Sequence, residues 1–290
     1  MTRKILSTDL DGTLIFHGSV RDEDLAALRR WREAGHLLVM NTGRSIQALH
    51  SALDARGLEF DYAVLYSGAV IIDGDYQILH VTPLPEDVPA ELLRIVGAAD
   101  GVTVFATTLD ADYQIYDTLG SSTALLTLFP QGTPEDLAGR TVIGVPVRVA
   151  DGPLFERIRD GVEECWGGRV IGFRNQDFYD LVPVGVSKGL GLTELVTELT
   201  ASDGPYPGET IETWTVGDSW NDIPMHAVAD HAIAMASAPD EVVEVCATTT
   251  PSVAAAVDWV LAAEADPNAL AAWRNADGEM TWPSDPKELA

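Results

Sequence analysis

The sequence predicts an α/β protein whose core is a doubly wound parallel sheet, with a second, α+β domain inserted into it. Short apolar runs alternate with segments of helical periodicity near both ends of the 290-residue chain. This alternation is typical of parallel strands joined by crossover helices. Between residues 83 and 183 the alternation is lost. A crossover needs only about a dozen residues, so we expect this segment to fold as a domain of its own.

Five apolar runs predict the core strands, at residues 5–8, 36–40, 62–66, 213–216 and 232–235. Continuous runs of this length are typical of strands that are buried on both faces of a parallel sheet. Asp73-Gly74-Asp75 separates the runs 70–72 and 77–81 and predicts a hairpin turn. Ligands of such sheets bind at the carboxyl ends of the strands, so the residues after each run are the candidates for function.

Two core helices are predicted from apolar stripes. In segments 192–199 and 253–261 the apolar residues recur at i, i+3, i+4 and i+7, which is the spacing of one helix face. Each helix is therefore expected to pack that face on the sheet.

The inserted segment predicts its own helices and strands. We expect helices at 86–98 and 154–166, and strands at 102–107, 113–116, 142–149, 170–173 and 178–182. The expected division is a core of residues 1–82 and 184–265, a cap domain at 83–183 and a loosely held acidic tail at 266–290.

Composition limits the partners of the protein. With 18 basic and 45 acidic residues the net charge is −27, which repels nucleic acids and anionic membranes. A phosphorylated substrate would be repelled as well, so a phosphate site here needs a bound cation. Cys165 and Cys246 have no metal-binding spacing. No stretch resembles a signal peptide or a membrane span, so a cytoplasmic location is expected, and the oligomeric state stays open.

Acidic residues follow the first and fourth predicted strands. The stretch Asp9-Leu-Asp-Gly-Thr contains Asp11 and Gly12, and Gly217-Asp-Ser-Trp-Asn-Asp contains Asp218, Asn221 and Asp222. Two acids beside a glycine that lets backbone N–H groups approach a ligand are typical of a site for a cation and a phosphoryl group. The structural alternative is that these residues form a turn or cap the following helix.

Two further stretches have weaker signals of their own. Thr42-Gly43-Arg44 follows the second strand and could be an ordinary turn between a strand and a helix. Lys188 lies four residues before the apolar stripe at 192–199 and is expected to begin that helix. Although lysines are usually solvated, a cation at a helix N-terminus is not stabilised by the helix dipole, which indicates a separate role.

Taken in this order, the motifs resemble the haloacid dehalogenase superfamily, specifically its Cof-like branch (type IIB, with a C2 cap), which includes sugar-phosphate phosphatases. The resemblance rests on Asp9-Leu-Asp-Gly-Thr-Leu, Asn41-Thr-Gly-Arg, Ser67-Gly-Ala, Gly185-Val-Ser-Lys-Gly, Gly217-Asp-Ser-Trp-Asn-Asp-Ile-Pro-Met and Ala232-Ile-Ala-Met-Ala. Ser67 and Ser237 stand where many relatives have Asn, which leaves the subfamily less defined.

The resemblance implies a two-step mechanism. Asp9 would form an aspartyl-phosphate, and Asp11 would protonate the leaving group and later activate water. Asp11 must then begin protonated, a state that crowding by other acids favours. Mg²⁺ would be bound by the Asp9 and Asp218 carboxylates and the Asp11 carbonyl, with Asp222 and Asn221 in or beside its coordination sphere. The residues expected to bind the substrate's phosphate are Gly12, Thr42, Gly43, Arg44, Lys188 and Asn221.

Three functions remain open. The leading hypothesis is a Mg²⁺-dependent phosphatase of small phosphorylated metabolites, sugar phosphates first. An acid at position 11 favours phosphate esters, since dehalogenases expel halide without a proton donor. The alternatives are a phosphomutase of the same branch and a non-catalytic binding protein on the same scaffold. In the cap, Arg148, Arg174 and Tyr179 could face the substrate, although salt-bridge or packing roles are the expectation for each.

Overall fold

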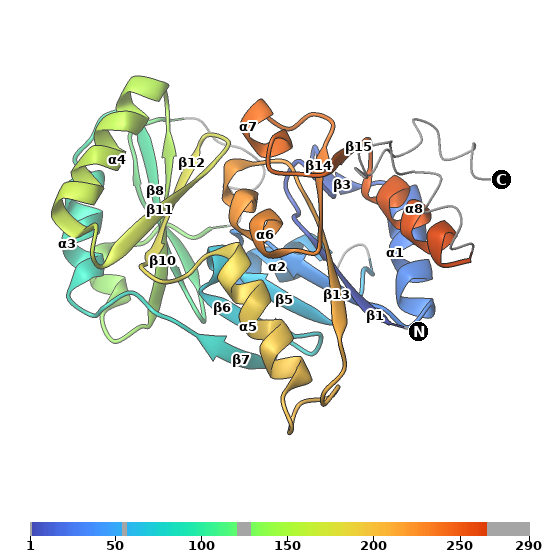
Figure 1. The fold of residues 1–290 in the computed structure, drawn as a ribbon. Coiled ribbons are helices and arrows are strands. Elements are labelled where there is room, and N and C mark those ends of the chain that lie inside the picture. Colours follow the sequence, from blue (N-terminus) through green and yellow to red (C-terminus); the bar gives the residue numbers. More distant parts are fainter. Residues whose placement is uncertain (1, 54–56, 121–128, 266–290) are drawn as a thin grey trace.

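The computed structural model describes residues 2–53, 57–120 and 129–265. The acidic tail expected at 266–290 lies outside the described residues. Within the described part, one large sheet, a smaller five-stranded sheet and a short β2–β3 pair (Ile15–Phe16 and Ser19–Val20) account for the strands. The two larger sheets lie side by side in Figure 1.

The larger sheet has the strand order β15-β14-β13-β1-β4-β5-β6-β7. Its pairs are parallel from β15 to β5 and antiparallel from β5 to β7. The strand bounds are β1 Arg3–Thr8, β4 Leu37–Asn41, β5 Tyr62–Leu65, β6 Val70–Asp73, β7 Ile78–Val81, β13 Ile211–Gly217, β14 His231–Met235 and β15 Thr248–Thr250. Since β1 lies between β4 and β13, the chain segments that follow these three strands emerge together at one edge.

Helices cover both faces of this sheet because the buried strand residues alternate in direction. Ile5 and Val39 pack with leucines of α5 (Lys188–Thr200) on one face. Leu6 and Met40 belong to the cluster that also contains residues of three other helices, α1 (Asp22–Glu33), α2 (Ile46–Leu53) and α8 (Val253–Ala265). The remaining core helices are α6 (Ile223–Val228) and α7 (Asp240–Val243).

The smaller sheet is formed within the inserted segment and is antiparallel, with the order β11-β12-β10-β8-β9. Its helices α3 (Val88–Val96) and α4 (Gly152–Trp166) lie on the side away from the core (Figure 1). The other face of the sheet is therefore turned toward the core. The strand bounds are β8 Val102–Thr108, β9 Asp112–Asp117, β10 Val142–Val149, β11 Val170–Asn175 and β12 Phe178–Pro183.

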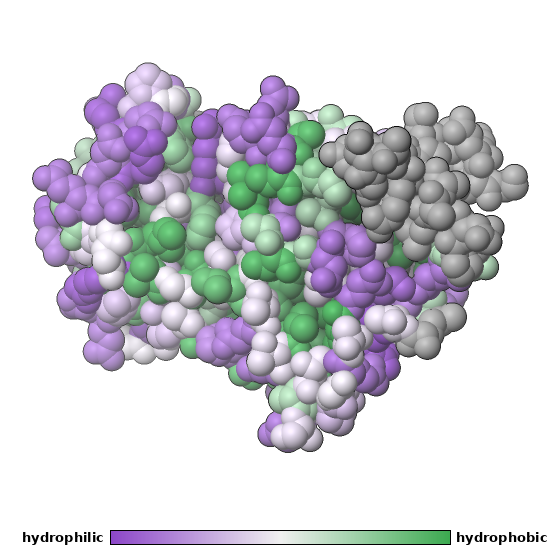
Figure 2. Space-filling model, in the orientation of Figure 1, coloured by the Kyte–Doolittle hydropathy of each residue, from purple (hydrophilic) through white to green (hydrophobic). Residues whose placement is uncertain are grey.

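The predicted fold class is confirmed, including the hairpin of β6 and β7, whereas β15 and the β2–β3 pair were not predicted. The limits 83 and 183 of the cap stay a prediction. In the described part of the chain, no helix is long and apolar enough to cross a membrane. Figure 2 shows apolar side chains over α5 and α6, where Leu190 and Val228 are exposed.

Candidate active site

Asp9 follows β1 directly and lies in a buried cluster of charges. The Lys188 ammonium, at the start of α5, is 2.7 Å from Asp9 Oδ1 and 2.6 Å from Asp222 Oδ1, and its side chain is fully buried. Burial alone would lower the pKa of Lys188, but the carboxylates of Asp222 and Asp9 outweigh burial and raise it. Lys188 is thus a permanent cation that orients the Asp9 carboxylate.

Three carboxylates converge at this point from two loops that are far apart in the sequence. One oxygen each from Asp9, Asp218 and Asp222 lies within 4.8 Å of the other two. Burial raises the pKa of Asp9 well above its usual range, in spite of Lys188, and raises the pKa of Asp218 to about 6, assisted by Asp222. The cluster is therefore an environment in which negative charge is unfavourable until a cation compensates it.

The donor set fits a hard divalent cation. Mg²⁺ binds oxygen ligands at about 2.1 Å in an octahedron, which places neighbouring ligand oxygens about 3–4 Å apart. The three carboxylates each place one oxygen within 4.8 Å of the others, so they lie close enough together to share one ion. Asp222 has further partners, because its Oδ2 accepts hydrogen bonds from the amides of Asp218 and Ser219, each at 2.9 Å. Asp222 therefore fixes the loop that carries Asp218 and also contributes charge.

Gly12 allows the two loops to approach each other. Its φ of +86° is in the left-handed region, and a Cβ at this position would lie 2.3 Å from Asp218 Oδ2. The neighbouring Thr13 hydroxyl donates to Asp218 Oδ1 at 2.7 Å. No residue larger than glycine fits at position 12 without displacing the Asp218 carboxylate.

Polar residues at the end of β4 complete the core side of the site. Asn41 Nδ2 donates to Ser7 Oγ and to the carbonyl of Lys188, both at 3.1 Å, and so ties β1, β4 and α5 together. Thr42 is buried, and its hydroxyl accepts a hydrogen bond from the amide of Arg44 at 3.2 Å.

Asn221, in the loop after β13, is also buried. Within the described residues neither polar atom of its side chain has a hydrogen-bond partner.

Asp11 has a basic partner that the sequence analysis did not expect. Its two oxygens form a bidentate ion pair with Arg44, with both N–O distances at 2.6 Å. Arg44 is therefore held by Asp11 and is not free to bind phosphate in this arrangement. The Asp11 side chain is one-third exposed, and its charge is one of those that raise the pKa of Asp9 and Asp218.

The cap contributes two polar residues that the sequence reasoning missed. Asp180 in β12 is buried against the core, where its Oδ2 accepts a hydrogen bond from Ser67 at 3.4 Å and would lie 2.6 Å from a Cβ on Gly43. Burial raises the pKa of Asp180 to about 7, against the lowering effect of Lys188. Gln176 reaches the carbonyl of Asp11 at 3.5 Å. The only sequence signal for Asp180 is an acid within an apolar strand.

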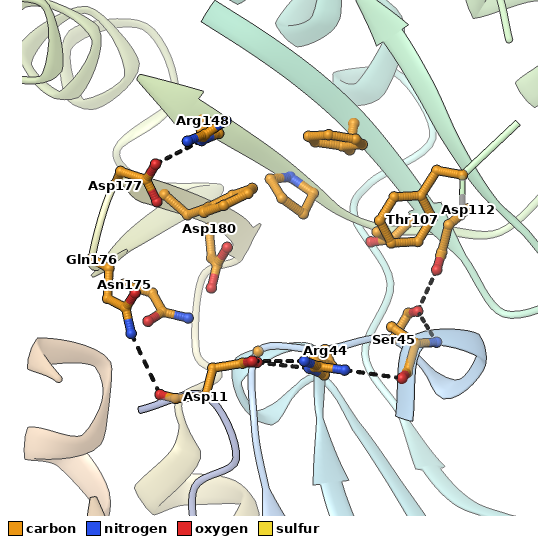
Figure 3. Close-up of a pocket in the computed structure, with 16 residues that line it drawn as sticks. Asp11, Arg44, Ser45, Thr107, Asp112, Arg148, Asn175, Gln176, Asp177 and Asp180 are labelled. Atoms are coloured by element: carbon orange, nitrogen blue, oxygen red, sulfur yellow. Dashed lines mark hydrogen bonds and ion pairs between the residues drawn. The ribbon is translucent and has the colours of Figure 1, made fainter. Parts of the chain in front are cut away.

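A cavity of about 270 Å³ lies between core and cap, directly beside Asp11 and Arg44 (Figure 3). Figure 3 shows Arg148 and Asp177 on one side of this cavity and Thr107 and Asp112 on the other. Asp180 and Gly43 line it as well. The cavity is thus continuous with the part of the site where Asp11 meets the cap.

Comparison with known proteins assigns this architecture to a family. The family model described as haloacid dehalogenase-like hydrolase matches residues 6–258. The chain belongs to the haloacid dehalogenase-like hydrolases. This match spans both acidic motifs and the inserted cap, and the resemblance inferred from those motifs is confirmed.

Named relatives of this haloacid dehalogenase-like hydrolase are phosphatases. It is 24% identical to the 5-amino-6-(5-phospho-D-ribitylamino)uracil phosphatase YwtE of Bacillus subtilis (83% of this chain, 90% of the relative). It is 25% identical to the pyridoxal phosphate phosphatase YbhA of Escherichia coli (83% and 91%).

Solved structures share the fold. A haloacid dehalogenase-like hydrolase from B. subtilis superposes with a TM-score of 0.74 at 20% identity, covering 88% of this chain and 98% of its own. A sugar phosphatase of subclass IIB gives a TM-score of 0.68 at 20% identity, with 85% and 93% covered.

The three cap residues considered from the sequence have different positions in this hydrolase. Arg148 lines the cavity and pairs with Asp177 at 2.6 Å. Arg174 lies over the rings of Phe155 and Trp220, the latter in the core. Tyr179 is buried in the cap interior. Of the three, only Arg148 is therefore placed to meet a substrate.

Proposed function

We propose that the protein is a Mg²⁺-dependent phosphatase that hydrolyses small phosphorylated metabolites through a phosphorylated Asp9. The observation that carries the proposal is the buried meeting of Asp9, Lys188 and Asp218 close to Asp11, which itself lines the cavity between core and cap. The phosphatase names of the relatives YwtE and YbhA support it. Sugar phosphates are one candidate class, alongside the phosphorylated ring compounds in those two names.

Asp9 is the proposed nucleophile. Lys188 holds Oδ1, so the other carboxylate oxygen is available to attack phosphorus, and the ester bond breaks as the Asp9–phosphate bond forms. Water then hydrolyses the aspartyl-phosphate and returns free phosphate. Dividing the reaction in this way replaces one difficult displacement with two easier ones.

The proposed Mg²⁺ ligands are the carboxylates of Asp9 and Asp218, the carbonyl of Asp11, and Asp222 in or next to the coordination sphere. When bound, the cation would neutralise charge on the transferring phosphoryl group. Thr42, Asn221, Lys188 and the amide of Gly43 are proposed to hold the phosphoryl oxygens. The Gly12 amide donates to the carbonyl of Ile15 at 3.1 Å, so it would join them by exchanging that partner. The unpartnered amide of Asn221 is the donor that this role requires.

Asp11 is the proposed general acid and base, and its ion pair with Arg44 adds a condition. A carboxylate held by a guanidinium does not donate a proton, so Arg44 must first exchange Asp11 for another anion. The phosphate of an entering substrate is such an anion. Once released and protonated by solvent, Asp11 would donate that proton to the leaving oxygen and later accept a proton from the attacking water.

Replacement of the nucleophile tests the proposal. We expect Asp9→Asn to lower phosphate release from a panel of phosphorylated metabolites at least about a thousandfold. The matched control is Asp203→Asn, an exposed acid in the turn that follows α5. Undiminished turnover by Asp9→Asn protein with a native circular dichroism spectrum would refute the role of Asp9.

A further inference from the structure

The cap side of the cavity is walled by aromatic rings. Phe105, Phe129, Phe178 and Pro146 line it. The Phe105 and Phe129 ring centroids are 5.5 Å apart at 64°, and those of Phe105 and Phe178 are 6.2 Å apart. None of these four side chains can donate or accept a conventional hydrogen bond.

An acid with an unused oxygen lies in the same cavity. Asp112 at the start of β9 is only 3% exposed, and the Ser45 hydroxyl donates to its Oδ2. Its Oδ1 is buried and has no hydrogen-bond partner within the described residues. A buried acceptor without a donor is costly unless a ligand supplies one.

Most of the other polar groups that line this cavity already have partners. Asp11 is bound to Arg44 and Asp177 to Arg148, and the Thr107 hydroxyl donates to the carbonyl of Gly144. A sugar laid against the phenylalanine wall would turn several hydroxyl groups toward carbon atoms, and burial of unpaired hydroxyls is unfavourable. A flat apolar ring avoids this cost and gains ring–ring contacts.

We propose, building on the phosphatase function above, that the substrate's leaving group carries a planar aromatic or heteroaromatic ring with an N–H donor. The ring lies against Phe105, Phe129 and Phe178, and the N–H group meets Asp112 Oδ1. The phosphate of the same molecule is directed toward Asp9, on the core side of the cavity. The cap thereby selects ring-bearing phosphate esters over sugar phosphates.

Matched esters test the ring. Benzyl phosphate and cyclohexylmethyl phosphate have leaving groups of similar size and differ in planarity and aromaticity. We expect kcat/KM for benzyl phosphate to exceed that for cyclohexylmethyl phosphate, and that for ribose 5-phosphate, by about tenfold. Phe178→Leu should bring the ratio of the first two close to one. Phe155→Leu is the control, since this ring packs against Tyr179 outside the cavity, and it should leave the ratio unchanged.

Asp112→Asn tests the N–H contact. The amide keeps a hydrogen-bond acceptor for Ser45 but loses the charge, so kcat/KM for pyridoxal 5′-phosphate, whose ring nitrogen carries a proton, should fall about tenfold or more. The value for benzyl phosphate, which has no ring N–H group, should fall by a clearly smaller factor. An equal fall for both esters would assign Asp112 a structural role and overturn this contact.

The outcomes separate the two proposals. If the wild-type protein releases phosphate from none of these esters, the phosphatase function fails. If it releases phosphate but treats ribose 5-phosphate as well as benzyl phosphate, or if Phe178→Leu keeps the wild-type ratio, the ring preference is refuted while the phosphatase function stands.

Discussion

Burial changes the acidity of single carboxyl groups on both sides of the cleft. On the core side it raises the pKa of Asp9 and Asp218, and on the cap side it raises the pKa of Asp112 and Asp180 to about 7. Lys188 is buried among the acids of the core side. On both sides of the cleft, burial therefore disfavours the negative charge of these carboxyl groups unless a cation or a hydrogen-bond donor compensates it.

Asp180 gives a prediction on pH-dependent stability. Its folded pKa of about 7 lies above the unfolded value of about 4. The folded protein thus binds the additional proton within this window, and the free energy of unfolding falls as pH rises from about 4 to about 7. Asp180→Asn removes this loss. The free energy of unfolding of the variant, relative to that of the wild type, should therefore increase by about 2–4 kcal/mol from pH 5 to pH 8.

Urea unfolding at both pH values, without added metal, measures this gain. Asp203→Asn serves as the control because its side chain is exposed in the native protein. A difference between Asp180→Asn and wild type that is the same at pH 5 and pH 8 would contradict the assignment.

The sequence identified those site residues whose role can be inferred from the residues next to them along the chain. Asp9 and Asp218 were identifiable because each follows an apolar run at a strand end. Asp112 and Asp180 were not, since their surroundings come from other elements, such as Ser45 and Ser67. The Asp11–Arg44 pair was missed for the same reason, because it depends on how two loops approach in space.

At the scale of elements, three neighbouring strands determine the site. β13, β1 and β4 are parallel and adjacent, so their following loops meet at one edge. The position of these loops at the carboxyl ends of the strands was predicted from the apolar runs, whereas the order of the three strands was not. The facing surface of the cap was not predictable, since alternation along β8 and β12 does not tell which face a second sheet covers.

At Gly12 the loop after β1 closely approaches the loop that carries Asp218, and this contact leads to a prediction for the elements. Gly12→Ala should push Asp218 away and raise the Mg²⁺ concentration for half-maximal activity by about 10–100-fold. Gly35→Ala is a matched control, because Gly35 has nearly the same φ, +85°, with no atom within 4 Å of a Cβ. Equal effects of the two substitutions would mean that backbone strain alone, and not contact with Asp218, is responsible.

At the scale of the whole molecule, a net charge of −27 opposes compaction. Any salt relieves this repulsion, whereas a cation bound among Asp9, Asp218 and Asp222 stabilises only the folded chain. Millimolar MgCl₂ should therefore raise the melting temperature by about 2–4 °C more than NaCl at equal ionic strength. Differential scanning fluorimetry measures both shifts.

Asp218→Asn separates the specific from the general effect of Mg²⁺. It should abolish the excess shift while keeping the shift caused by NaCl. Identical shifts with the two salts in the wild type would argue against a cation site in the cluster.

The position of β13 in the sheet also affects how the protein is made. β1 pairs with β13 along one side, yet Ile211–Gly217 is synthesised long after Arg3–Thr8, with the whole inserted segment between them. At ribosomal rates of about 5–20 residues per second, the interval is roughly 10–40 s. During that time the first strand has one unpaired edge. In a newly made chain, the whole inserted segment is therefore synthesised before β13 can pair with β1 and complete the larger sheet.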